Sequence, residues 1–221
     1  GSVPTDLEMA GVNTLILTNQ ERLFAKYGSD ASIAVNAMNE LVNYLDTTPD
    51  LGLSAQVVNV DGDDDVRAAF DLLDGEACDP NVVNGAVREI AALIAELRNS
   101  DPTTTIDNII IVGDDDVIPF ARLADDTTIA NETSFAWTFQ GAEANSLFGV
   151  AAGGYYQSDE PYGDLDPIRA GKRVLFVTDT SLGRLVETPS EIAGQVATFI
   201  TFEGTLNPST GFVSGYDFLS D

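Results

Sequence analysis

Ile109-Ile110-Ile111-Val112-Gly113 is the most apolar short run in the sequence, and it decides the fold. Four consecutive β-branched residues closed by a glycine are typical of a central strand that is covered on both faces. Shorter apolar runs of the same kind precede it at 14–18 and 54–60 and follow it at 174–178. We therefore predict strands at these positions.

Amphipathic segments separate the predicted strands. Apolar residues recur at steps of three and four over 33–45, 66–73, 82–97 and 189–203, which predicts helices there. The polar stretch up to Ser32 is expected to be a connection, and 125–154 an irregular excursion with at most one helical turn around Asn145. Alternating strands and helices predict an α/β fold, a three-layer, open, mostly parallel sheet with helices on both faces.

Composition excludes several classes of function. The chain has 221 residues, no histidine, one cysteine and a net charge of −26. Catalysis by a Ser-His-Asp or Cys-His arrangement within the chain is therefore excluded, and Cys78, Ser158, Ser181 and Ser214 have no histidine base. Nucleic acid and anionic lipid are poor partners for so acidic a chain, and no run reaches the ~18 apolar residues of a membrane span.

Cations are the natural counterpart of such a chain, and one acidic cluster resembles part of a calcium loop. Asp61, Asp63 and Asp65 stand at its first, third and fifth positions, but Val66 replaces the required glycine and Leu72 the bidentate glutamate. The cluster also precedes a predicted helix, where aspartates cap free amides. Capping is the favoured interpretation, with a calcium site as the alternative.

A second acidic cluster, Asp114-Asp115-Asp116, directly follows the central strand. Sites in open α/β sheets form beyond the carboxyl ends of strands, so these side chains are placed to bind a cation or to line a pocket. Three adjacent aspartates cannot all face one point, and at most two would act as ligands. We take Asp114 and Asp116 as candidate ligands; a solvated turn stiffened by Pro119 is the alternative.

Four segments together resemble the gingipain family of cysteine peptidases. In chain order they are Ile111-Val112-Gly113-Asp114 with Asp116-Val117-Ile118-Pro119-Phe120, then Ser158-Asp159 with Tyr162-Gly163, then Asp179 with Gly183-Arg184, and then Thr188-Pro189 through Phe202-Glu203. Phe202 stands where the family has tyrosine. The likeness covers 109–203, whereas the earlier half matches only as a βα pattern.

The resemblance implies a caspase-like fold of two subdomains, of which the second carries the catalytic histidine and cysteine. This chain is similar to the first subdomain and has no counterpart of the family's Gly-His-Gly segment or nucleophilic cysteine, so no catalytic residue is carried over. Asp159 is expected to bond loop amides or help hold a structural cation. Arg184 is expected to pair with an aspartate on the same edge, with Gly183 allowing a tight turn.

These observations give one expected function and two rivals. We expect the non-catalytic N-terminal subdomain of a secreted or cell-surface prokaryotic cysteine endopeptidase, whose partners are a downstream catalytic subdomain and a protein or peptide substrate. Residues 1–13 would be a tag-cleavage remnant and lead-in, 14–212 the domain, and 213–221 the start of the second subdomain. The first rival is an inactive cell-surface binding module that takes calcium. The second rival is a nucleotide-binding or receiver-like domain. A glycine-rich phosphate loop is absent, which disfavours nucleotide binding, and Lys172 precedes the last predicted strand, so no lysine is available on a late strand for a receiver.

Overall fold

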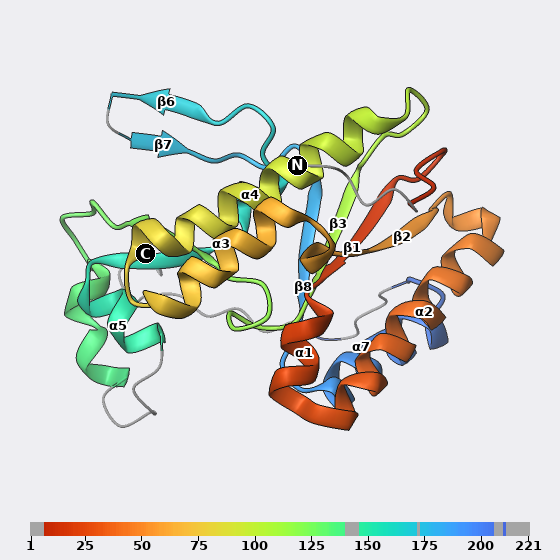
Figure 1. Cartoon of the computed structure of the whole chain (residues 1–221), viewed down its shortest axis with the longest axis horizontal. Coiled ribbons are helices and arrows are strands. Elements are labelled where there is room, and N and C mark those ends of the chain that lie inside the picture. Colours follow the sequence, from red (N-terminus) through yellow and green to blue (C-terminus); the bar gives the residue numbers. More distant parts are fainter. Residues whose placement is uncertain (1–6, 140–145, 172, 206–209, 211–221) are drawn as a thin grey trace.

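A four-stranded parallel sheet forms the centre of the molecule, with the strand order β2-β1-β3-β8 (Figure 1). The computed structural model describes residues 7–139, 146–171, 173–205 and 210. The sheet strands are β1 (Thr14–Thr18), β2 (Ala55–Asn59), β3 (Asn108–Val112) and β8 (Ser181–Leu185). Every residue of β1 is buried, and Ile109, Ile111 and Val112 of β3 are buried too. The predictions for the first three strands are confirmed.

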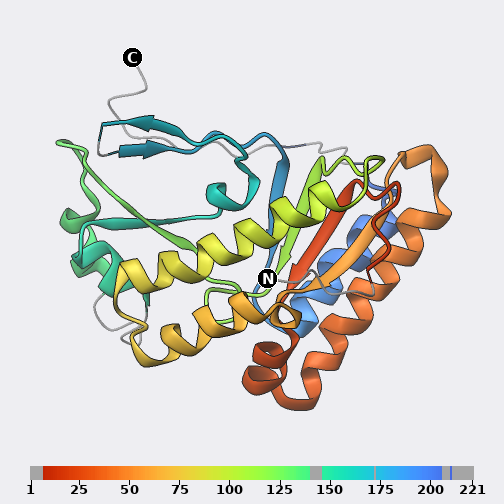
Figure 2. The same cartoon turned by 45° about the horizontal axis from the view of Figure 1, so that its top comes forward.

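Helices cover both faces of this sheet, as Figures 1 and 2 show. One layer consists of α2 (Ala31–Thr47) and α7 (Pro189–Thr201), and the other of α3 (Asp64–Gly75) and α4 (Pro80–Ser100). The predicted stripes are largely buried, as Met38, Leu41 and Leu45 of α2 are, whereas Phe199 and Ile200 of α7 are only half-buried. The α/β prediction of a parallel sheet between helical layers is therefore confirmed.

The segment before Ser32, expected to be a connection, contains α1 (Gln20–Tyr27) and a 3-10 turn, η1 (Gly28–Asp30). Asn19 caps α1, because its side-chain oxygen accepts a hydrogen bond of 3.0 Å from the backbone N–H of Arg22. Leu23 is the one residue of α1 that is buried, so the helix has little apolar periodicity by which to be recognised. Short 3-10 turns also flank β2, namely η2 (Pro49–Leu51) and η3 (Val60–Gly62).

The prediction of a sheet strand at 174–178 is wrong. Only β7 (Arg173–Leu175) forms there, and it pairs antiparallel with β6 (Ile168–Ala170) outside the central sheet. The fourth sheet strand is β8, which pairs with β3. Its sequence contains Gly183 and Arg184, and such an edge strand lacks the continuous apolar run of a central one.

The excursion between β3 and β8 holds more regular structure than expected. It includes β4 (Ala121–Ala124), which pairs antiparallel with β5 (Tyr155–Ser158). Between them lie η4 (Glu132–Ser134), η5 (Ala136–Phe139) and the seven-residue α5 (Ser146–Ala152), and α6 (Glu160–Gly163) follows β5. Asn145, where one helical turn was expected, lies outside the described residues.

Within the described part of the chain, no helix is both long and apolar enough to cross a bilayer.

Candidate functional site

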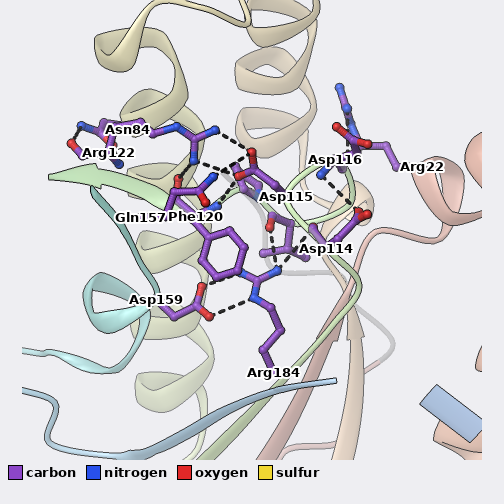
Figure 3. Close-up of polar contacts among 12 residues, drawn as sticks. Arg22, Asn84, Asp114, Asp115, Asp116, Phe120, Arg122, Gln157, Asp159 and Arg184 are labelled. Atoms are coloured by element: carbon purple, nitrogen blue, oxygen red, sulfur yellow. Dashed lines mark hydrogen bonds and ion pairs between the residues drawn. The ribbon is translucent and has the colours of Figure 1, made fainter. Parts of the chain in front are cut away.

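The candidate site lies where β3 and β8 end, around the loop of residues 113–120 (Figure 3). Parallel strands bring their carboxyl ends to the same edge, and in open α/β sheets this edge is where sites form. The loop starts at Gly113, whose N–H donates to the carbonyl of Leu185 at 3.0 Å. It therefore stays attached to β8 as it leaves β3.

Arg184 of β8 is the centre of the site. Its guanidinium pairs with both carboxylate oxygens of Asp159, and the two side chains are only 6% and 17% exposed. It also donates to the carbonyls of Gly113 at 2.7 Å and Ile118 at 2.8 Å. The guanidinium carbon lies 3.9 Å from the centre of the Phe120 ring, a cation–π distance. One side chain thus joins β8, the loop and the residue before α6.

The predicted pairing of Arg184 with an aspartate on this edge is what the structure shows. The predicted role of Gly183 is wrong, because this residue lies in the middle of β8 and forms no turn. In the described contacts the Asp159 carboxylate bonds Arg184 and not loop amides.

A second buried ion pair lies on the other side of the loop. Asp115 receives two parallel hydrogen bonds from Arg122, of 2.9 and 2.6 Å, and also accepts from the Phe120 N–H at 2.8 Å. Asn84 of α4 holds the backbone of Arg122 through two hydrogen bonds, of 2.7 and 2.9 Å. This bidentate pair ties the loop to β4 and α4.

Asp114 and Asp116 face the opposite way from Asp115, toward Lys26 of α1 (their relation to Asp115 is visible in Figure 3). The Lys26 ammonium pairs with both carboxylates. Partial burial by itself lowers the pKa of Lys26, but the hydrogen bonds to Asp114 and Asp116 outweigh it and raise the pKa above its ordinary value. A lysine ammonium therefore occupies the point at which these two carboxylates were expected to hold a cation.

The first acidic cluster also has partners within the protein. Asp63 caps α3 by accepting from the N–H groups of Asp65 and Val66 at 2.9 and 3.0 Å, as the capping interpretation requires. Asp61 turns away to α1, where it accepts from the Glu21 N–H at 2.9 Å. Calcium at Asp61, Asp63 and Asp65 stays a prediction, as it does at Asp114, Asp116 and Asp159.

A third group of carboxylates was not predicted. Asp164, Asp166 and Asp179 bring carboxylate oxygens within 4.8 Å of one another, a spacing that could hold a metal ion. Asp164 and Asp179 already accept backbone hydrogen bonds from Val177 and Leu165, of 2.7 and 2.9 Å. No sequence motif indicated this group, because Asp179 comes close to Asp164 and Asp166 only through the β6–β7 hairpin between them.

The contacts of the strand-end site hold the backbone of the loop at 113–120. Each of its carboxylates faces an arginine or a lysine, and Tyr162, buried to 2% exposure, donates its hydroxyl to the Pro119 carbonyl. Burial raises the pKa of this hydroxyl, which keeps it a neutral donor. The site contains no histidine or cysteine, and Cys78 is exposed in a cleft formed by the start of α4, α5 and Arg122.

Lys26 and Arg122 were not predicted as site residues, and Asp115 was named only as a member of the acidic cluster. The charge pattern gave one usable signal: a chain with only 10 lysines and arginines against 36 acids has few counter-charges for buried carboxylates. Any arginine beside an apolar strand was therefore a candidate partner.

Comparison of the chain with protein-family models, curated proteins and solved structures found no match.

Proposed function

We propose that the chain is the non-catalytic, N-terminal subdomain of a gingipain-like cysteine endopeptidase, with a caspase-like fold that supports a Cys/His dyad supplied by another part of the protein. One observation carries the proposal. Three of the four segments that resemble the family meet at a single side chain, because Arg184 bonds Asp159 and the carbonyls of Gly113 and Ile118. These residues lie far apart in the sequence but form one structural unit, which is a physical reason for them to occur together in a family.

The geometry supports a scaffold role for this unit. Two buried Arg–Asp pairs and one lysine bridge fix the loop between 113 and 120, so it offers a rigid edge to a neighbouring subdomain. In the complete enzyme a thiolate would attack the peptide carbonyl and a histidine would transfer the proton. This chain supplies neither residue. Its contribution is to position the catalytic subdomain that docks on it.

The first test of this proposal is an activity assay. We expect the 221-residue protein to hydrolyse no Arg- or Lys-containing peptide, since it has no histidine and a single exposed thiol. The Cys78→Ala variant is the matched control and should be indistinguishable from the parent. Turnover that a thiol reagent stops, and that Cys78→Ala lacks, would contradict the proposal.

Reading the gene downstream of the codon for Asp221 distinguishes this proposal from its rival. A Gly-His-Gly segment and a cysteine after an apolar strand, with activity in the longer protein, would support the peptidase. A longer reading frame without them would favour the rival proposal, a binding module with the same fold.

We also propose that the chain binds calcium, because a divalent cation suits so acidic a chain. Because a ligand that binds only the folded state raises its stability, millimolar calcium should raise the Tm relative to chelator. The Lys26 and Arg184 pairs already neutralise Asp114, Asp116 and Asp159, so Asp166→Asn should reduce the rise more than Asp116→Asn. An unchanged Tm in calcium would contradict calcium binding.

A further inference from the structure

The β6–β7 hairpin projects from the body of the molecule as an arm, in both views of the chain (Figures 1 and 2). Among the described residues its strands pair only with each other. Its base is fixed, because Asp164 accepts from the N–H of Val177 and Asp179 from the N–H of Leu165. We refer to residues 167–178 as the arm.

The arm exposes apolar side chains that a lone hairpin cannot cover. Ile168 and Leu175 form a cross-strand pair, and each is 56% exposed. Val174 and Val177 are exposed as well. An isolated two-stranded hairpin is marginally stable in water, and clustered exposed apolar groups mark interaction surfaces.

The arm also differs in charge from the rest of the chain. It contains Arg169, Lys172 and Arg173 and no acidic residue, whereas all 36 aspartates and glutamates lie outside it. An apolar, basic arm therefore fits an apolar groove with acidic surroundings. An anionic membrane would offer charge and apolar surface, but no sheet edge with which a strand of the arm could pair.

The same chain carries a groove with these properties. It has a volume of about 410 Å³ and lies between α2 and α7 and the face of the sheet at β3 and β8. Its lining is largely apolar and includes Leu41, Leu45, Leu53, Gly183, Val196 and Phe199. In the described residues β8 pairs only with β3, so its other edge offers unpaired backbone groups. The exposed Asp46 lies beside this groove, because its carboxylate accepts hydrogen bonds of 3.2 Å from the hydroxyl of Ser54 and the N–H of Ala55, which follow the lining residue Leu53.

We propose that the arm of one copy docks in the groove of a second copy, and that two such contacts related by a two-fold axis form a dimer. The Ile168–Leu175 pair fills the apolar groove, one arm strand extends the sheet at the edge of β8, and Arg169 meets the acidic surroundings. This inference does not depend on the proposed function. Because the two copies repel each other through their net charge, association should tighten as salt screens that charge.

The test is sedimentation velocity of the full chain between about 1 and 200 μM, in low and in 0.5 M NaCl. We expect a concentration-dependent dimer that is more populated in high salt. Leu175→Asp in the arm should weaken it at least about tenfold, the effect of ~1.4 kcal/mol. Gly183→Leu should do the same by filling the groove, since a Cβ at this position meets nothing within 4 Å.

Mixing these two variants gives the decisive measurement. Each alone lacks both contacts, but the mixture retains one intact arm and one intact groove, so heterodimers should reappear. Leu72→Asp, on an exposed residue of α3, is the control for an added charge and should leave dimerisation unchanged apart from the slightly higher repulsion. A chain that stays monomeric at all concentrations overturns the proposal. So does dimerisation insensitive to Gly183→Leu, or a Leu175→Asp defect seen only in binding to anionic vesicles.

Discussion

Replacing Arg184 with methionine is expected to lower the free energy of unfolding by about 3–5 kcal/mol, the usual cost of breaking a buried ion pair by removing one partner. The Asp159 carboxylate, 17% exposed, would remain without its counter-charge. The carbonyls of Gly113 and Ile118 would also lose their donor. Urea denaturation followed by far-UV circular dichroism measures the change.

Two companion variants show whether the buried charge is the cause. Arg67→Met removes a pair with Asp64 in which both side chains are about half exposed or more, so it should cost no more than about 1 kcal/mol. Adding Asp159→Asn to Arg184→Met removes the stranded charge and should recover part of the loss. If Arg184→Met is no more destabilising than Arg67→Met, Arg184 does not hold the site together.

The central strands could be predicted because buried strands consist of runs of apolar and β-branched residues, which are visible in the sequence. β1 is buried at every residue and β3 at Ile109, Ile111 and Val112, so these positions favour apolar or β-branched residues. β8 could not be found in the same way, since it lies at the edge of the sheet that the described residues form and gives one of its positions to Arg184. The apolar run at 174–178 was misleading because its side chains belong to a surface that the chain itself leaves exposed.

The candidate site, too, could be predicted only in part. Its carboxylates could be predicted, because local sequence shows clustered aspartates after a strand. Their counter-charges could not, since Lys26 lies 88 positions from Asp114 and Arg184 lies 25 from Asp159. When the counter-charges of a run of aspartates are unknown, the sequence favours interpretation of the run as a metal site. Once Lys26 and Arg122 are placed beside it, the same run is a set of ion pairs that position a loop.

Replacing Gly113 with alanine is the second large effect that we expect. Gly113 has φ of +113°, a region that side chains other than glycine rarely adopt. A Cβ there would lie 2.6 Å from the Cβ of Val117, which is fully buried and has no free direction in which to move. Backbone strain of about 1–3 kcal/mol and overpacking of about 1–3 kcal/mol should both act. The variant should therefore lose several kcal/mol in the same urea experiment.

Gly183→Ala is the matched control, because it makes the same chemical change on the neighbouring strand. A Cβ at Gly183 meets nothing within 4 Å, and its φ is not positive. The substitution also reduces the freedom of the unfolded chain, so it should be neutral or stabilising by up to about 1 kcal/mol. Equal effects of the two substitutions would show that the turn at Gly113 relaxes easily. In that case the loop would not be the rigid edge that the scaffold role requires, since Arg184 bonds the carbonyl of this same glycine.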